Sequence, residues 1–80
     1  MTTEGKILLD RITIKPGLMG GRPTIRGLRF TVADVLELLA SGLSVQEVLD
    51  EHPILEKEDI RAALLYASQK LKTTATIHAA

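Results

Sequence analysis

Short apolar runs separated by glycine and proline make up the first thirty residues of the chain. The run Ile7–Ile14 alternates apolar and polar side chains in its second half, which predicts a half-buried strand. Met1–Gly5, ahead of this run, is expected to fray. Pro16-Gly17 then predicts a turn, and Gly20-Gly21 a second flexible point.

A second β-prone segment, Thr24–Phe30, surrounds a single glycine. Gly27 tolerates a positive φ angle, so Arg26-Gly27 is the predicted turn of a short hairpin. Strands this short are unstable alone, and the hairpin must therefore pack on helices. The candidates for burial within it are its apolar side chains, Ile25, Leu28 and Phe30.

The remainder of the chain predicts three helices, of which the first is marked at both ends. Thr31 followed by Asp34 is close to a capping box, and Gly42 supplies the C-terminal cap. Between them the apolar residues follow the i, i+3, i+4, i+7 spacing of an amphipathic helix: Val32, Val35, Leu36 and Leu39.

The second and third helices follow through a proline-containing connection. Ser44–Glu47 is a capping box that opens the second helix, and Pro53 ends it by about His52. The third helix is predicted over residues 57–72, with an inner stripe of Ile60, Ala63, Leu64, Ala67 and Leu71. Leu65 and Tyr66 lie well away from this stripe, which makes them candidates for an oligomer contact.

The length of 80 residues allows one small domain. We assign it to residues 11–72, with 1–10 as a lead-in and 73–80 as a disordered tail. The hydrophobic fraction is 45%, yet there is one Phe, one Tyr and no Trp, so the core must be aliphatic. A chain this short buries only about 60% of its unfolded surface, and we therefore expect a homodimer or a permanent partner.

The composition also restricts the compartment. The chain has no cysteine, which excludes disulfides and thiolate metal sites. No apolar run approaches the roughly 20 residues that span a bilayer, and the N-terminus is too polar for a secretory signal. We therefore expect a cytoplasmic protein.

The charges are unevenly distributed along a chain whose net charge is zero. Residues 1–33 carry six Lys or Arg against two acids, a balance of +4, and residues 34–80 carry four against eight, a balance of −4. A basic N-terminal part suits phosphates or an acidic protein surface. It equally suits the chain's own acidic helices, and the sequence leaves both interpretations open.

No constellation of catalytic side chains is evident. The two histidines, His52 at a helix end and His78 in the tail, lack the spacing of a ligand pair. The clustered acids suit solvated helix faces and helix N-termini better than a cation site. The glycines match neither common phosphate-loop pattern. We therefore expect no enzyme, no catalytic residues, no cofactor and no metal site.

Binding is the remaining class of function. Three short helices, the last two joined by a turn, make a helix-turn-helix-like arrangement. The first turns of the third helix would then read DNA, but three acids accompany its basic residues there and repel phosphates. The hairpin offers better candidates. The full set of candidate partner- or DNA-binding residues is Lys15, Arg22, Arg26, Arg29, Lys57 and Arg61.

The order of motifs over about residues 11–67 resembles the DUF433 family. The resemblance rests on RITI, PG and MGGRPTIRGLRF in the first part, and on SVQEVL, HP, EDI and AALLYA in the second. Three positions depart from the family's pattern: Glu56 and Leu28 replace the usual threonines, and Phe30 replaces an aliphatic residue.

The resemblance implies a mostly α fold, a homeodomain-like three-helix bundle preceded by a β-hairpin. It also implies an antitoxin paired with a PIN-like ribonuclease toxin of the Mut7-C type. The first hypothesis is then an antitoxin that neutralises the nuclease and regulates its own gene by binding DNA. Arg22, Arg26 or Arg29 would enter the acidic metal pocket of the nuclease and displace the cation. The second hypothesis is a helix-turn-helix transcriptional regulator without a toxin partner.

Overall fold

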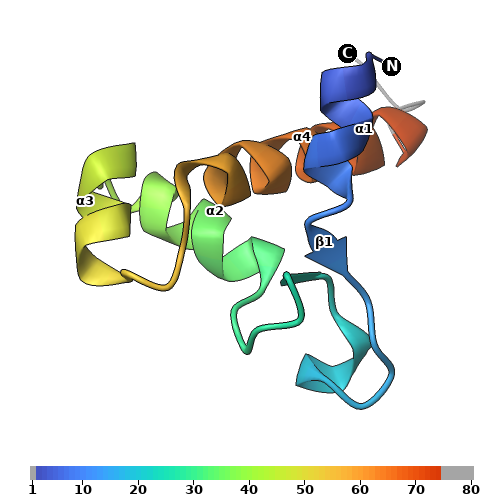
Figure 1. The fold of residues 1–80 in the computed structure, drawn as a ribbon, viewed down its shortest axis with the longest axis horizontal. Helices are drawn as coiled ribbons and strands as arrows, with labels where there is room; N and C mark the ends of the chain where they lie inside the picture. Colours follow the sequence, from blue (N-terminus) through green and yellow to red (C-terminus); the bar gives the residue numbers. More distant parts are fainter. Residues whose placement is uncertain (1, 75–80) are drawn as a thin grey trace.

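The computed structural model describes residues 2–74, in which a small two-stranded sheet lies at one side of four helices (Figure 1). The predicted class, mostly α with an N-terminal antiparallel hairpin, is confirmed. Within the described range, no helix combines the length and the apolar composition needed to cross a membrane. The elements are α1 (Thr3–Leu9), β1 (Ile12–Thr13), a 3₁₀ turn (Met19–Gly21), β2 (Thr24–Ile25), α2 (Val32–Ala40), α3 (Val45–Glu51) and α4 (Lys57–Thr74).

Helix α1 stands where the sequence predicts a frayed end and the start of a long strand, so that prediction is wrong. The Thr2 hydroxyl oxygen accepts a hydrogen bond from the Gly5 N–H at 3.0 Å and caps the helix. Leu8 is buried, and α1 packs across α4 (Figure 1). Tertiary packing therefore makes a helix of a short apolar run, and the strand shortens to Ile12–Thr13.

The two ends of the predicted domain also differ from expectation. The lead-in of residues 1–10 contains α1, which belongs to the packed structure. At the other end α4 continues to Thr74 and so includes the first two residues of the expected disordered tail. The rest of that tail, residues 75–80, lies outside the described residues.

The two-stranded sheet pairs β1 with β2, and β2 directly precedes the predicted turn at Arg26-Gly27. β1 and β2 are antiparallel, with Ile12 opposite Ile25 and Thr13 opposite Thr24. The connection between them contains the 3₁₀ turn, in which Gly20 has a φ angle of 68°. A long loop therefore projects from the sheet, on the side away from α3 in Figure 1.

The predicted turn at Arg26-Gly27 is confirmed. Both residues have positive φ angles, 48° and 72°, and the Leu28 N–H donates to the Ile25 carbonyl at 2.8 Å. The Ile25 N–H in turn donates to the Phe30 carbonyl at 2.9 Å, so the chain returns alongside β2 after the turn.

Both predicted capping boxes are confirmed as well. Thr31 and Asp34 exchange two hydrogen bonds of 2.9 Å at the start of α2. Ser44 and Glu47 exchange bonds of 2.8 and 3.1 Å at the start of α3. Gly42 follows α2 with a φ angle of 104°, as expected of a C-terminal cap. These local contacts place α2 and α3 where the sequence predicts them.

An aliphatic core fills the space between helices α2, α3 and α4 and the hairpin. Phe30 and Leu28, predicted to be buried, are only half-buried, and Phe30 packs edge-on against His52 with ring centroids 5.0 Å apart. The fully buried members come from all of these elements: Ile25, Val35, Val48, Ile60 and Ala63.

The inward face of α4 is rotated relative to the predicted stripe. Ile60 and Ala63 are buried as predicted, but Leu64 and Leu71 are 46% and 67% exposed. Tyr66, predicted to lie off the stripe, packs against the core. The reason is twofold. First, α1 covers one flank of α4 (Figure 1). Second, the 18 residues of α4 span about 27 Å, whereas the nine residues of α2 span about 13 Å, so the last turns of α4 extend beyond α2.

Candidate binding surface

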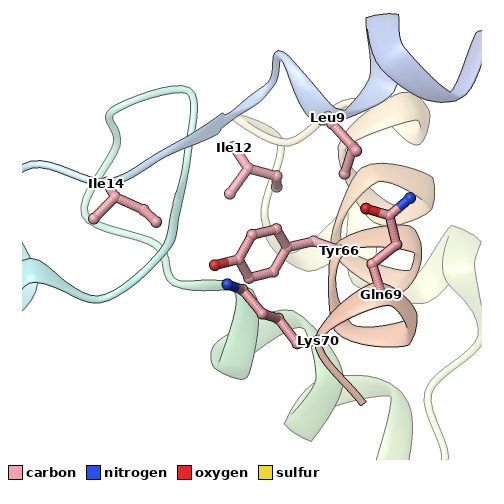
Figure 2. Close-up of a pocket in the computed structure, with 6 residues that line it drawn as sticks. All are labelled: Leu9, Ile12, Ile14, Tyr66, Gln69 and Lys70. Atoms are coloured by element: carbon pink, nitrogen blue, oxygen red, sulfur yellow. The ribbon is translucent and has the colours of Figure 1, made fainter. Parts of the chain in front are cut away.

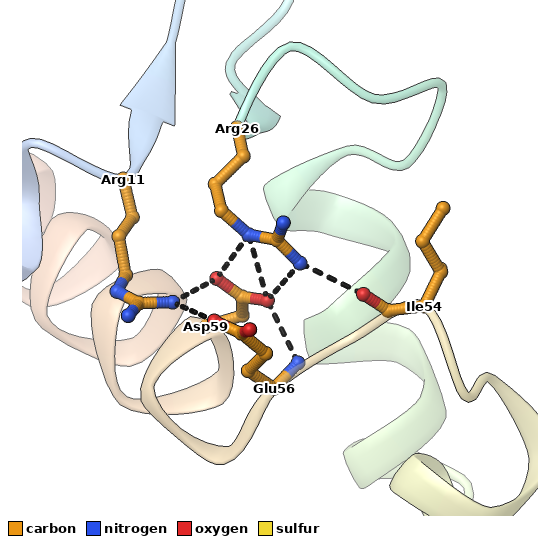
Figure 3. Close-up of polar contacts among 5 residues, drawn as sticks. All are labelled: Arg11, Arg26, Ile54, Glu56 and Asp59. Carbon is orange, nitrogen blue, oxygen red and sulfur yellow. Dashed lines mark hydrogen bonds and ion pairs between the residues drawn. The ribbon is translucent and has the colours of Figure 1, made fainter.

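A buried carboxylate ties the N-terminal part of the chain to α4 (Figure 3). The side chain of Asp59, in the first turn of α4, is 0% exposed. Arg11, between α1 and β1, donates from Nη1 to Asp59 Oδ1 at 3.0 Å. Arg26 donates from Nη2 to Oδ2 at 2.8 Å and from Nε to both oxygens, and the Glu56 N–H donates to Oδ2 at 2.8 Å. We name this cluster of Arg11, Arg26, Glu56 and Asp59 the Asp59 latch.

The latch also fixes the connection between α3 and α4. Arg11 donates to Glu56 Oε1 at 2.7 Å, and Arg26 Nη2 donates to the Ile54 carbonyl at 2.7 Å. Glu56 precedes α4 where a capping side chain is usual, and its carboxylate binds Arg11. Asp59, the third residue of α4, accepts a hydrogen bond from the Glu56 N–H, as the third helical residue does in a capping box. The hairpin therefore holds the start of α4.

The pKa of Asp59 is lowered even though the side chain is buried. Burial alone disfavours the charged carboxylate and raises the pKa, but the hydrogen bonds from Arg26, from the Glu56 N–H and from Arg11 outweigh it. The pKa of Arg11 is raised by its bonds to Glu56 and Asp59, and that of Arg26 by its bonds to Asp59. The latch is therefore ionic at neutral pH.

The latch pairs the charge of one predicted partner-binding residue, Arg26, whose side chain stays 33% exposed. Arg26 is engaged with Asp59, and so is Arg11, which the sequence pattern does not single out as a site residue. For these two arginines, neutralisation by the chain's own acidic helix is confirmed. The pairings span 33 and 48 residues, and no local motif signals them. The uneven charge of the two halves of the chain is the one indication in the sequence.

The two candidates on α4 lie at its first turns. Lys57 and Arg61 are both exposed, and Arg61 Nη1 lies 3.3 Å from Glu4 Oε2 of α1. Glu58, between them, is also exposed. The structure therefore presents basic and acidic side chains together at this end of α4, as the sequence indicates.

The other three candidates lie on two neighbouring segments, Lys15 and Arg22 on the connection between β1 and β2 and Arg29 after the Arg26-Gly27 turn, and we call Lys15, Arg22 and Arg29 the basic loop. All three side chains are exposed. Arg22 Nε donates to the Met19 carbonyl at 3.0 Å, a neutral acceptor that does not offset its positive charge. Lys15 and Gly27 line one shallow hollow, so the long connection and the Arg26-Gly27 turn lie against each other. The basic loop thus carries three exposed positive charges.

Two apolar grooves flank the C-terminal half of α4. The first, of about 300 Å³, lies between α4 and the α1–β1 segment, with Tyr66 and Lys70 facing Leu9, Ile12 and Ile14 (Figure 2). The second, of about 330 Å³, lies between α4 and α2, and we call it the α2–α4 groove. It is lined by Pro23, Val32, Ala33, Leu36, Tyr66, Ala67, Lys70 and Leu71.

The predicted oligomer-contact pair lies at this part of α4 but is less exposed than Leu64 and Leu71. Leu65 and Tyr66 are half-buried, and Tyr66 lines both grooves. The Lys70 ammonium lies 5.5 Å from the centre of the Tyr66 ring, within range of a cation–π contact. The more exposed apolar side chains of α4 are Leu64 and Leu71.

The carboxylates outside the latch are spread over the helices. Among residues 2–74, no three side chains of metal-binding type come together. Asp34 is engaged in the cap of α2, and with Glu37 it lines a separate hollow that Phe30 and His52 also border.

Comparison with known proteins supports a family assignment. The family model of DUF433, described as a protein of unknown function, matches residues 12–67. An uncharacterized protein, y4eO of Sinorhizobium fredii, is 43% identical over 56 residues, which are 70% of this chain and 25% of that protein. The chain thus matches about a quarter of that relative's length. A crystal structure of a DUF433 member from Anabaena variabilis aligns with a TM-score of 0.74 and 32% identity, over 85% of this chain and 67% of that one.

Proposed function

Because the chain belongs to the DUF433 family, we propose that it is a binding protein of the antitoxin type, which holds a PIN-like ribonuclease inactive. The nuclease as partner comes from what the family resemblance implies. A cytoplasmic location, a lack of catalytic activity and a homodimeric state are further parts of the proposal.

The observation that carries the binding role is the division of the basic residues. Arg11 forms ion pairs with Asp59 and Glu56, and Arg26 forms one with Asp59, so both charges are paired within the chain. Lys15 and Arg22 remain exposed on the connection between β1 and β2, and Arg29 remains exposed between the Arg26-Gly27 turn and α2. Three exposed positive charges on a chain whose other charged residues are mainly acidic favour an acidic partner surface, and such complementarity contributes to association rate and specificity.

The basic loop could inhibit such a nuclease by occupying its metal pocket. A PIN-like nuclease holds its cation with carboxylates. A guanidinium of the basic loop that entered this pocket would form charge-assisted hydrogen bonds with those carboxylates and take the place of the cation. Arg22 and Arg29 are the candidates, whereas Arg26 is held by the Asp59 latch.

The first test is identification of the partner. Tagged protein is recovered from an extract of its native cells, and the bound proteins are identified by mass spectrometry. A small nuclease at near-equal stoichiometry is the expected result. Recovery of the protein alone, together with failure to suppress the activity of any nuclease encoded beside it, would refute the antitoxin proposal.

A pair of matched double variants then locates the contact. The variant Arg22→Ala/Arg29→Ala is expected to lose inhibition of the nuclease in an RNA cleavage assay. The variant Lys57→Ala/Arg61→Ala removes the same charge from exposed positions on α4 and is expected to inhibit normally. Equal inhibition by the two variants would show that the basic loop is not the contact.

DNA binding is the second candidate function, either for regulation of the protein's own gene or as its main activity. The succession of α3 and α4 through a short turn favours it. The exposed Glu56 and Glu58 beside Lys57 weaken it, because phosphates would meet carboxylates at the start of α4. A salt titration of binding to upstream DNA tests this candidate. A DNA affinity that falls steeply with salt concentration, and a slope that Lys57→Ala/Arg61→Ala reduces, would establish α4 as the recognition helix.

A further inference from the structure

A hollow of about 310 Å³ lies beside α2, at the contact between Phe30 and His52, and we call it the His52 hollow. Four of its six lining residues belong to α2 or follow it directly, and their i, i+3, i+4, i+7 spacing puts them on one face of the helix: Asp34, Glu37, Leu38 and Ser41. The rings of Phe30 and His52 pack edge to face beside them, with centroids 5.0 Å apart. The hollow thus combines two carboxylates with apolar and aromatic side chains.

The two carboxylates of the His52 hollow are not balanced by a base in the described part of the chain. The exposed Glu37 side chain makes no ion pair or hydrogen bond there. Asp34 accepts from the Thr31 N–H through Oδ2 at 2.9 Å, which leaves Oδ1 without a partner among residues 2–74. Residues 30–56 hold six acids and no Lys or Arg, and no ion pair joins Arg29 to either carboxylate. The hollow is therefore negatively charged.

The C-terminal end of α2 adds to this negative charge. A helix C-terminus carries a partial negative charge, which basic side chains in the last turn commonly offset. α2 ends at Ala40 without a basic residue in its last turn, and the Ser41 hydroxyl donates to the Leu38 carbonyl at 2.6 Å. Glu37 lies in the same turn. The backbone and the side chains at this end of α2 therefore favour a cation.

We infer that the His52 hollow binds an arginine side chain of a partner protein. Asp34 and Glu37 are three residues apart, so their carboxylates are neighbours on the surface of α2. The planar guanidinium presents five N–H donors and bonds both carboxylates at once, whereas a lysine ammonium acts as a point charge. Phe30 and Leu38 then pack against the aliphatic part of the arginine.

A protein side chain fits the hollow better than a metal ion. Among residues 2–74, no three side chains of metal-binding type come close enough to hold a cation, although Asp34, Glu37 and His52 line the same hollow. The apolar lining also suits a long side chain. The inference is independent of the basic loop and of a nuclease partner, so failure of the antitoxin proposal leaves it standing.

The experiment titrates the isotopically labelled full chain with N-acetyl-arginine amide and follows the backbone amides by NMR. The control ligand is N-acetyl-citrulline amide, which has nearly the same shape but no charge. The arginine ligand is expected to cause saturable shifts at Leu38, Ser41 and His52, at millimolar concentration because a single side chain makes few contacts. No saturable shift at these residues, or equal binding of the two ligands, would overturn the inference.

Substitutions at the hollow then test the location. Glu37→Gln is expected to weaken binding of the arginine ligand about tenfold, the equivalent of one charge-assisted hydrogen bond, and it leaves the Asp34 cap of α2 intact. Glu51→Gln is the matched control, because Glu51 is exposed and lies outside the lining of the hollow. Equal weakening by the two variants would indicate a general effect of charge and would overturn the inference.

A second variant fills the hollow from within the chain. Ser41→Arg places an arginine four residues after Glu37, at the spacing of a favourable ion pair on a helix. This arginine is expected to compete with the free ligand and so to abolish its saturable binding, while circular dichroism shows that the helices are kept. Unchanged binding by Ser41→Arg would place the ligand elsewhere.

A second copy of this chain is the competing source of the arginine. Analytical ultracentrifugation of the unaltered protein and of Glu37→Gln is expected to show the same mass for both. A dimer that dissociates on the Glu37→Gln substitution and persists in Glu51→Gln would show that another copy fills the hollow, and would overturn the assignment of the arginine to a different protein.

Discussion

Replacing Asp59 with asparagine removes the charge on which two arginines converge and nearly preserves the shape of the side chain. Arg11 and Arg26 then lose their carboxylate partner, and the asparagine amide nitrogen, a donor, replaces an oxygen that accepts from a guanidinium or from the Glu56 N–H. The substitution therefore affects the attachment of the hairpin to α4 and leaves the aliphatic core as it is.

The expected loss can be worked from the geometry. Removing one partner of a buried ion pair costs about 3–5 kcal/mol, because the remaining charge keeps its desolvation penalty. The Arg11 and Arg26 side chains are 28% and 33% exposed, so water relieves part of this penalty and the lower end, about 3 kcal/mol, applies. At about 0.05–0.15 kcal/mol per residue, 80 residues give a free energy of unfolding of about 4–12 kcal/mol. The substitution thus removes a quarter or more of the total.

Urea unfolding followed by circular dichroism measures this loss. For a domain of this size, about 3 kcal/mol corresponds to a fall in Tm of about 12–24 °C. Glu58→Gln is the control, because Glu58 is exposed in the same helical turn and carries the same charge; it is expected to change stability by less than about 0.5 kcal/mol. A loss below about 1 kcal/mol for Asp59→Asn, or an equal loss for Glu58→Gln, would refute the reasoning.

Three further predictions concern stability. Because the pKa of Asp59 is lowered in the folded protein, its ionised carboxylate contributes fully to stability at pH values above the ordinary aspartate pKa of about 3.9. This stabilisation is lost as the pH falls through the folded-state pKa, so the urea midpoints of the unaltered protein and of Asp59→Asn should converge in acid. Thr31→Ala should cost about 1–2 kcal/mol through loss of the α2 cap, and Thr31→Ser should restore most of it in the same urea assay. Gly27→Ala should lower the free energy of unfolding by about 1–2 kcal/mol, because a φ of 72° is strained for a residue with a side chain, even though the added Cβ would meet no non-neighbouring atom within 4 Å. Gly17 has no such positive φ, so Gly17→Ala should leave the thermal unfolding temperature unchanged.

The features that the sequence predicts correctly are those that neighbouring residues determine. The capping boxes at Thr31 and Ser44 and the turn at Arg26-Gly27 each involve residues at most three apart, and all are present. Residue types at fixed local spacing are sufficient to specify such contacts, whatever the rest of the chain does. The three predicted helices accordingly lie within two residues of their predicted ends.

The features that the sequence does not predict depend on contacts between distant segments. Ile7–Leu9 is short enough to suit either a strand or a helix, and packing on α4 decides for the helix. The same packing turns Tyr66 inward and leaves Leu64 and Leu71 outside. The candidate site shows the same division. The exposure of Lys15, Arg22 and Arg29 is what the charge of each side chain predicts, whereas the ion pair between Arg26 and Asp59 depends on contacts that only the fold creates.

The Asp59 latch also restricts how this sequence can evolve. A lone neutral substitution at position 11 or 26 leaves part of the Asp59 charge without a partner, and one at position 59 leaves two guanidinium groups facing each other. Each single step is therefore more costly than a concerted replacement of the whole group by apolar residues. Positions 11, 26 and 59 are accordingly expected to be inherited as one unit among relatives that share the hairpin, either all ionic or all changed, and to covary more strongly than the exposed residues of the basic loop.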